Sequence, residues 1–382
     1  MEEILHDFAP LRQHGQERDE DKQENDPKEA NLVLKELQKM EATPAAASRD
    51  TGADADLRAA CKKGSLAEVK RILDTCRADV NCRVRHGMTP VMWAAGRGHR
   101  DVVELLVNQG TDVSLVDNDG NNILHHACRE GHRETVEFVL SLDGVDINSK
   151  EWRSRTPVME AAERGHRHVV ELLVSKGADV SLVDNDCNNI LHHACREGDR
   201  KTVDFLLSLD GVDINSRGGS SRTPVMEAAE WGHNDVVELL VSKGADVSLV
   251  DDDGDNVLHW ACVGGGRETV ECLLCLGSMD INSRGRCSRT PVMEAARRGH
   301  NDVVELFVSK GADVSLVDDD GDNVLHYACM GGDRKTVEFV LSLEEMDINV
   351  RNNIGQTAAD VARREGHTNL MEVLGSQRCH VM

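Results

Sequence analysis

The chain has 382 residues and a formal net charge of −24, with 68 Asp and Glu residues against 44 Lys and Arg residues. Contacts with phosphates rest on Lys and Arg, so this balance argues against a nucleic-acid binder and against adsorption to anionic membrane surfaces. A protein partner that carries a basic patch is electrostatically favoured instead. The first residues (MEEILHDFAP) contain no basic segment, and no apolar run reaches membrane-spanning length, so we expect a soluble protein made in the cytosol.

Residues 1–52 carry dense mixed charge and end in a stretch rich in Ala, Ser and Thr. Such a composition buries too little apolar surface to fold alone, so we expect a disordered arm. Within it, Leu32, Leu37 and Met40 recur at roughly helical spacing. Two interpretations of residues 28–41 stay open: a transient helix in a solvated tail, and a short helix that docks in the groove of a partner.

The rest of the chain repeats itself. Two ladders of residues have a spacing of 67: Thr89, Thr156, Thr223 and Thr290 form the first, and Asn122, Asn189, Asn256 and Asn323 lie midway between them. Units of 33 and 34 residues therefore alternate, and we call them Thr-Pro units and Asn units. A period in this range is typical of stacked repeats. A chain built from one stacked unit presents an extended surface and seldom encloses a catalytic pocket.

Each unit predicts two helices and an extended arm. In the first Thr-Pro unit, Thr89 can cap a helix whose first residue is Pro90. Residues 100–108 carry the apolar pattern of a second, amphipathic helix, which Gly110 ends as a left-handed C-cap. Residues 113–120 supply the arm, with a tight Asp-Gly turn that is typical of a hairpin.

Two stretches, TPVMEAAERGHRHVVELLVSKGADV (156–180) and NILHHACREGHRETVEFVLSLDGVDIN (122–148), resemble the ankyrin repeat family. The resemblance covers residues 53–375 in about ten units, the first and last of which look like capping repeats. It implies an all-α solenoid in which each unit contributes a helix-turn-helix and a hairpin loop. In the family, a Thr and a His tie neighbouring turns by hydrogen bonds. Here the Thr-Pro units carry Met in place of that His, so we expect the two kinds of unit to complement each other.

The resemblance also implies which positions face the concave groove. Exposed aromatic residues beside Arg are typical of binding hot spots, so we expect the aromatic residues at these positions to be exposed and unpartnered. Packing between helices is the alternative that stays open. The candidate partner-binding residues are Trp93, Arg97, His126, Arg129, Glu160, Arg164, His193, Arg196, Glu227, Trp231, Trp260, Glu294, Arg297, Arg298 and Tyr327.

The predicted hairpin tips alternate in sign. Tips that follow Thr-Pro units are acidic, as in residues 251–255 and 318–322, and tips that follow Asn units are basic, as at Arg284 and Arg286. We favour pairing between adjacent tips, with surplus acidic tips near the C-terminal end left free for a basic partner.

No metal or cofactor is expected. The cysteines at 128, 195, 262 and 329 follow the 67-residue period and are interpreted as small buried apolar groups in a reducing compartment. The single Cys272-x-x-Cys275 pair and the adjacent histidines at 125–126 and 192–193 are weak evidence for zinc, since the repeat itself explains them. The sequence contains no phosphate-binding loop, nucleophile elbow or kinase signature, so it does not favour an enzyme.

Residues 376–382 are expected to form an exposed tail. They end in Cys379-His-Val-Met, which fits a C-a-a-X prenylation motif, and both farnesylation and coincidence stay open. A single lipid would give only weak, reversible membrane contact. We expect a monomeric cytoplasmic adaptor or scaffold, with a membrane-associated or nuclear fraction left open. The alternatives are a regulatory subunit that inhibits an enzyme and a farnesyl-anchored membrane adaptor.

Overall fold

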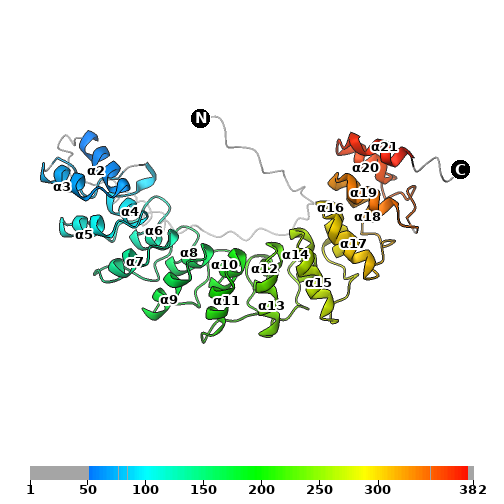
Figure 1. Ribbon diagram of the computed structural model, residues 1–382, viewed down its shortest axis with the longest axis horizontal. Coiled ribbons are helices and arrows are strands. Elements are labelled where there is room, and N and C mark those ends of the chain that lie inside the picture. The colour runs from blue at the N-terminus through cyan, green and yellow to red at the C-terminus, as the bar shows by residue number, and fades with distance from the viewer. Residues whose placement is uncertain (1–50, 76, 84, 345, 377–382) are drawn as a thin grey trace, which may run out of the picture. The chain divides into compact units, whose positions relative to one another are not determined.

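The computed structural model describes residues 51–75, 77–83, 85–344 and 346–376. Over this range the chain forms ten consecutive helix pairs arranged in a curved row (Figure 1). The inner helices, on the concave side of the row, are α2 (Thr51–Lys63), α4 (Pro90–Ala95), α6 (Ile123–Arg129), α8 (Pro157–Glu163), α10 (Ile190–Glu197), α12 (Pro224–Glu230), α14 (Val257–Gly264), α16 (Pro291–Arg298), α18 (Val324–Gly331) and α20 (Ala358–Arg364).

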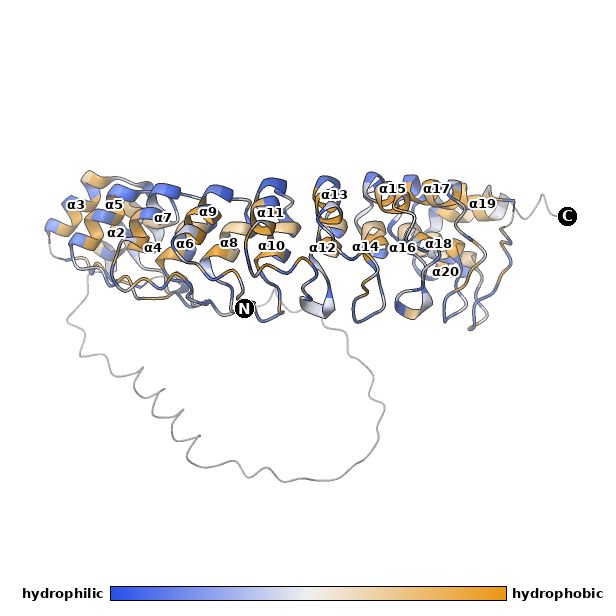
Figure 2. Ribbon diagram, turned by 90° about the horizontal axis from the view of Figure 1, so that it is seen from below, coloured by the Kyte–Doolittle hydropathy of each residue, from blue (hydrophilic) through white to orange (hydrophobic). Residues whose placement is uncertain are grey.

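The outer helices form the second row. They are α3 (Leu66–Asp74), α5 (Arg100–Asn108), α7 (Arg133–Leu140), α9 (Arg167–Ser175), α11 (Arg200–Leu207), α13 (Asn234–Ser242), α15 (Arg267–Cys275), α17 (Asn301–Ser309), α19 (Arg334–Leu341) and α21 (Met371–Ser376). Long loops connect one pair to the next and project from one side of the row (Figure 2). They contain the 3₁₀ turns η1 (Arg85–Gly87), η2 (Gly219–Ser221) and η3 (Arg286–Ser288), and η4 (Thr368–Leu370) precedes α21. Within the described range these loops form isolated β-bridges, Val250 with Asn256 and Val317 with Asn323, rather than strands.

The two kinds of unit begin their inner helices differently. In the Asn units, the Oδ1 atom of Asn122 accepts hydrogen bonds from the backbone N–H groups of Leu124 and His125 at 3.0 Å. These are two of the N–H groups that a helix start leaves without a partner. In the Thr-Pro units, proline occupies the first helical position, and the backbone N–H of Thr156 contacts the Sδ atom of Met159 at 3.5 Å.

The Asn units carry a histidine where the Thr-Pro units carry a methionine, and this histidine joins neighbouring units. The Nε2 atom of His125 donates to the carbonyl oxygen of Arg155, 3.2 Å away in the next Thr-Pro unit. In the return direction, Nε2 of His166, in the loop of that Thr-Pro unit, donates to the carbonyl of Arg129 at 3.1 Å. Equivalent bonds recur along the stack, so each Asn unit and the Thr-Pro unit that follows it are joined by reciprocal histidine bonds. The expectation that the two kinds of unit complement each other agrees with these bonds.

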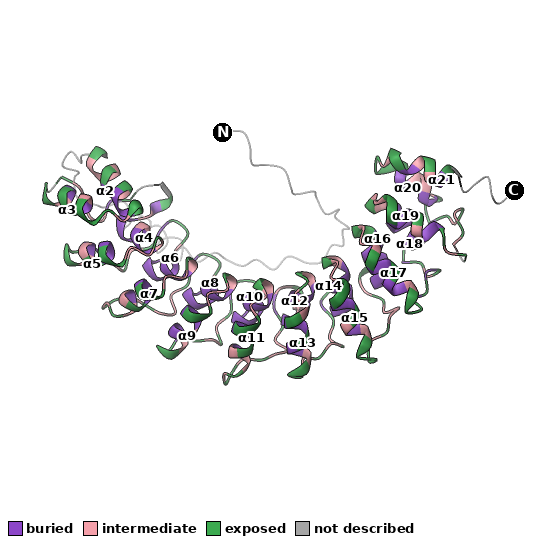
Figure 3. Ribbon diagram, viewed as in Figure 1, coloured by how far each residue is buried: buried purple, intermediate pink, exposed green. Residues whose placement is uncertain are grey.

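The core runs continuously between the two rows of helices, where Figure 3 shows the buried residues gathered. In each Thr-Pro unit the inner helix contributes Val, Met and two Ala residues, and the outer helix contributes Val and Leu; in α8 and α9 these include Ala161, Ala162, Val170 and Leu173. The small alanines let neighbouring inner helices approach closely. The closest approaches use glycine: a Cβ atom added at Gly264 would lie 2.1 Å from the carbonyl oxygen of Glu230.

The expected all-α solenoid is confirmed, as is a count of about ten units. The bounds of α5 agree with the helix expected over residues 100–108, and Gly110 follows it with φ of 84°. No helix in the described part of the chain is both long and apolar enough to cross a membrane. The arm over residues 1–50 and the end of the tail lie outside the described residues.

Candidate protein interface

Three of the candidate groove positions are glutamates that the structure places inside charge clusters. Glu160, on α8, is 1 % exposed and lies between two arginines: Arg129 Nε is 3.0 Å from one carboxylate oxygen and Arg155 Nη2 is 2.8 Å from the other. Arg155 also contacts Glu163 at 2.7 Å. Burial alone would raise the pKa of Glu160, but the hydrogen bond and the charge of Arg129, followed by the charge of Arg155, hold it below its usual value.

The same cluster recurs one period later and again, in altered form, after that. Glu227 is 2 % exposed, 3.1 Å from Arg196 and 3.3 Å from Arg222. Glu294 is 2.8 Å from Arg289 and 3.7 Å from Arg297. Because each carboxylate is buried and paired with arginine, these glutamates are engaged inside the stack and are not free to bind a partner.

The equivalent positions of the Asn units carry hydrogen-bond donors. Each donor bonds to the Oδ2 atom of an aspartate nine residues earlier, in the hairpin loop: His126 to Asp117 at 3.1 Å, His193 to Asp184 at 3.0 Å, Trp260 to Asp251 at 3.0 Å and Tyr327 to Asp318 at 2.6 Å. Four side-chain positions filled by three residue types thus make one kind of bond. Each such bond ties a hairpin loop to the inner helix that follows it.

Arginines of the Thr-Pro units connect these donors to the glutamate clusters. The guanidinium carbon of Arg222 lies 3.7 Å from the ring centroid of Trp260, and that of Arg289 lies 5.5 Å from the ring of Tyr327. Such stacking of a cation on an aromatic face is attractive. Two clusters of an aspartate, an aromatic residue, an arginine and a glutamate are therefore present in the C-terminal half, one around Trp260 and one around Tyr327.

The expectation that the groove aromatics are exposed and unpartnered is wrong for three of the four. Tyr327 is only 3 % exposed and Trp260 is half-buried, and both are hydrogen-bonded to aspartate. Trp93 is also half-buried, with Lys62 over its ring. Trp231 agrees with the expectation, at 57 % exposed. The buried histidines His126 and His193 are likewise structural ties rather than free groove residues.

An exposed stripe remains along the inner face. It consists of the second residue after the Ala pair in each Thr-Pro unit, and these residues are again spaced by 67: Arg97, Arg164, Trp231 and Arg298. Arg297 beside the last of them is exposed as well, and Arg129 and Arg196 are half-buried because their guanidinium groups are held by glutamate. We call the four spaced residues the groove stripe.

The hairpin tips pair with each other in a way that differs from the expectation of charge pairing. Arg217 and Arg284 donate to the backbone carbonyls of Val250 and Val317 in the next tip, both at 2.9 Å, rather than to carboxylates. One ion pair between tips is present in the described residues, Arg286 with Asp253 at 3.4 Å, and both side chains are more than half exposed. Several acidic side chains of the tips stay exposed: Asp119, Asp186, Asp252, Asp319 and Asp320.

Two exposed apolar residues in the tips were missed by the sequence analysis. Trp152 is 60 % exposed with Arg153 4.4 Å from its ring, and Ile354 is 73 % exposed. The signal was available, because Trp152 stands where the sister tips carry Gly219 and Arg286. Both residues add apolar contact area to the loop side of the repeats.

The structure tests the predictions for the periodic cysteines but does not describe the end of the tail. Cys128 and its three periodic equivalents are buried in the core, and burial raises the pKa of Cys329 to about 12, so these thiols are apolar packing groups, as expected. Among the described residues, no cluster of three or more His, Cys, Asp or Glu side chains is arranged to hold a metal ion. Cys379 and its C-a-a-X motif lie outside the described residues.

Comparison with known proteins adds a family match over most of the chain. The family model described as "Ankyrin repeats (3 copies)" matches residues 57–151, 144–218, 211–285 and 292–382. Over 349 residues, 85 % of this chain, the sequence is 24 % identical to the E3 ubiquitin-protein ligase KEG of Arabidopsis thaliana. It is 31 % identical over 292 residues to the ankyrin repeat and KH domain-containing protein mask-1 of Caenorhabditis elegans. It is 30 % identical over 224 residues to the nuclear factor NF-kappa-B p105 subunit of Gallus gallus.

These relatives are much longer proteins. The matches cover 74 % of this chain for mask-1 and 56 % for the p105 subunit, but only 21 %, 11 % and 22 % of KEG, mask-1 and p105 themselves. The similarity therefore concerns the repeats, and the chain spans less than a quarter of the length of each of these relatives.

Proposed function

Because the chain belongs to the ankyrin repeat family, whose repeats generally mediate protein–protein interaction, we propose that it is a non-catalytic scaffold or adaptor. Its partner-binding surfaces are the concave groove and the hairpin tips. The observation that carries this proposal is the groove stripe, in which Trp231 is 57 % exposed between Arg164 and Arg298 at repeat spacing. Exposed Trp and Arg are the residue types that dominate binding energy at interfaces.

The charge network supports a binding role over a catalytic one. A general acid or base must be free to exchange a proton with a substrate. Glu160, Glu227 and Glu294 are buried among arginines, and His126 and His193 are bonded to aspartate. These groups of the inner face are thus already engaged within the fold.

The hairpin tips supply the second surface and the chemistry of its partner. Exposed aspartates of the tips, together with exposed Trp152 and Ile354, favour a partner that presents basic side chains around an apolar contact. A regulatory subunit that covers the surface of an enzyme would use the same two surfaces, and it would appear as a single stoichiometric enzyme among the captured proteins.

The test uses the full chain as bait in a quantitative pull-down, with Trp231→Ala and Trp152→Ala as variants. Loss of the main partner with Trp231→Ala assigns it to the groove, and loss with Trp152→Ala assigns it to the tips. Both side chains are more than half exposed, so neither change should alter the melting temperature appreciably. If both variants capture the same proteins as the wild type at the same yield, the proposed surfaces are wrong.

A further inference from the structure

The first Thr-Pro unit departs from the glutamate cluster of its sisters. The position of Glu160, Glu227 and Glu294 is occupied by Trp93, one period earlier. The arginine that lies five residues before each of those glutamates (155, 222 and 289) is Met88 here. On the preceding inner helix, Lys62 takes the place of Arg129 and Arg196. One of the two cations of the cluster is therefore present, as Lys62, without the carboxylate that neutralises its counterparts in the sister units.

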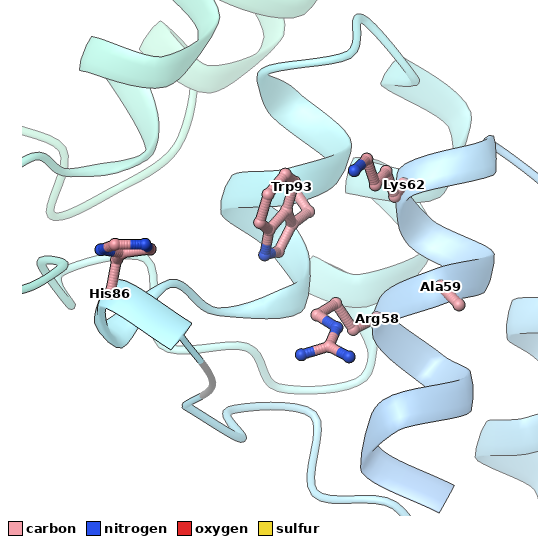
Figure 4. A pocket seen from close by; sticks show the side chains of 5 residues that line it. All are labelled: Arg58, Ala59, Lys62, His86 and Trp93. Atoms are coloured by element: carbon pink, nitrogen blue, oxygen red, sulfur yellow. The ribbon is translucent and has the colours of Figure 1, made fainter. Parts of the chain in front are cut away.

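The space around Trp93 is an open pocket of about 560 Å³, lined by Arg58, Ala59, Lys62, His86 and Trp93 (Figure 4). Arg58 and Lys62 project from one face of α2, and the Nζ atom of Lys62 lies 5.0 Å from the centroid of the indole ring. None of the lining residues is acidic, and in the part of the chain that the structure describes neither cation forms an ion pair with a carboxylate.

The indole nitrogen of Trp93 is buried and lacks an acceptor within the described range. The Nε1 atom of Trp93 has no hydrogen-bond partner among the described residues, whereas the indole of Trp260 donates to Asp251. Figure 4 shows this nitrogen on the side of the pocket where Arg58 and His86 lie. The pocket thus offers two cations and an aromatic ring, and its side chains provide no anionic acceptor.

The charge of the whole segment points the same way. Residues 51–100 contain ten Lys and Arg residues against five Asp and Glu residues, a surplus of five positive charges in a chain whose net charge is −24. Residues 101–382 contain 27 basic and 50 acidic residues. An acidic partner would be repelled by residues 101–382 and attracted to residues 51–100.

We propose that the pocket around Trp93 binds an acidic peptide segment of a partner protein, with a Glu or Asp carboxylate held by Lys62 and Arg58 and the adjoining apolar atoms against the indole ring. The ligand carboxylate would take the place that Glu160 and Glu227 occupy in later units, where a cation of the preceding inner helix lies about 3 Å from the carboxylate. A second hollow also borders Trp93 and is lined by Arg97, Arg129 and Glu130 among others, so it connects Trp93 with the first residue of the groove stripe. The proposal rests on the proposed function only in taking the ligand to be a protein.

The test measures binding of a fluorescein-labelled peptide of six glutamates, flanked by glycine, to the full chain by fluorescence anisotropy. The matched peptide of six glutamines is the ligand control. We expect the glutamate peptide to bind at least about tenfold more tightly than the glutamine peptide at low ionic strength, and this difference should shrink as salt is added. Equal binding of the two peptides would overturn the proposal.

Three variants locate the site. Arg58→Gln with Lys62→Gln should weaken binding about tenfold or more, while Lys335→Gln, an exposed lysine far along the stack, should leave it unchanged. Trp93→Glu restores the residue of the sister units, so it should fill the pocket with an internal carboxylate and abolish peptide binding without lowering the melting temperature. If Lys335→Gln weakens binding as much as the double variant, the attraction is only to net charge and the site is wrong.

One further variant tests whether the ligand of the pocket is a partner protein or the chain's own arm, because residues 17–26 of the arm are also rich in Asp and Glu. Neutralising those residues to Asn and Gln in the full chain should leave the affinity for the glutamate peptide within about twofold. A much tighter affinity would show that the arm competes for the pocket and would overturn the assignment to a partner. The pull-down with Trp231→Ala is independent of these measurements, so the proposed function and this inference can fail separately.

Discussion

Tyr327→Phe tests whether the aromatic residues of the Asn units hold the fold rather than a partner. The hydroxyl group of Tyr327 donates to Asp318 Oδ2 at 2.6 Å, in a site where the tyrosine is 3 % exposed. The other carboxylate oxygen of Asp318 keeps its two backbone donors, the N–H groups of Asp320 and Asp322. The substitution therefore removes one hydrogen bond to a charged acceptor and leaves one buried oxygen without its donor, which costs about 2 kcal/mol.

Tyr327→His is the matched control, because His126 and His193 make the same bond from the same position. It retains a donor and should recover about half or more of the lost stability. Long repeat arrays depart from two-state unfolding, so the local readout is hydrogen exchange of the amides in α18, which should lose protection by about 30-fold in Tyr327→Phe. A loss of stability below about 0.5 kcal/mol, or equal losses for Phe and His, would refute the assignment.

Three further predictions follow from the same geometry. Glu227→Ala should cost about 2 kcal/mol of local stability, read from hydrogen exchange of the amides in α12, because Arg196 loses its carboxylate and Arg222 keeps only Glu230. A change within about 0.5 kcal/mol, the range of a surface substitution, would contradict it. Burial lowers the pKa of His125 and His192 to about 4, so below about pH 6.5 the unfolded chain binds more protons than the folded one. The free energy of unfolding should therefore fall as the pH drops from about 6.5 to about 4, by about 3 kcal/mol for each histidine. A flat pH profile over this window would be inconsistent with neutral buried imidazoles. Cys187 has φ of 61°, in the left-handed region, where its sister tip carries Gly120. Cys187→Gly should therefore raise the free energy of unfolding by about 1 kcal/mol and increase the melting temperature. An unchanged or lower melting temperature would argue against strain at this residue.

The repeat period, the helix pairs and their ends could be predicted from the sequence because they depend on local signals. Pro90 after Thr89 marks a helix start, and Gly110 marks an end whatever the neighbouring units do. The fate of the groove residues could not be predicted in the same way. Whether Glu160 is free or neutralised depends on Arg129 in the preceding unit, and this is a contact between units rather than a local preference.

A signal for the buried network was nevertheless present in the repeats themselves. An aspartate stands nine residues before His126, His193, Trp260 and Tyr327, and all four residues can donate a hydrogen bond. An arginine stands five residues before each groove glutamate and is replaced by Met88 only where the glutamate is replaced by Trp93. Comparing the units with each other, rather than with the family, would have shown that these residues vary together. Exposed Trp152 breaks the pattern of its sister tips and could have been found in the same way.

The reciprocal histidine bonds between an Asn unit and the next Thr-Pro unit have a consequence for the length of the molecule. Removal of residues 156–222 would join Arg155 directly to Thr223, and the junction would read the same as the original Arg155–Thr156. His125 would still find the carbonyl oxygen of Arg155, so a shortened protein would contain no kind of interface that the present one lacks. Insertion of another 67-residue pair of units would likewise create no new kind of interface. The number of pairs can therefore change in single steps, and with it the length of partner surface that one molecule can span, while every joint keeps its chemistry.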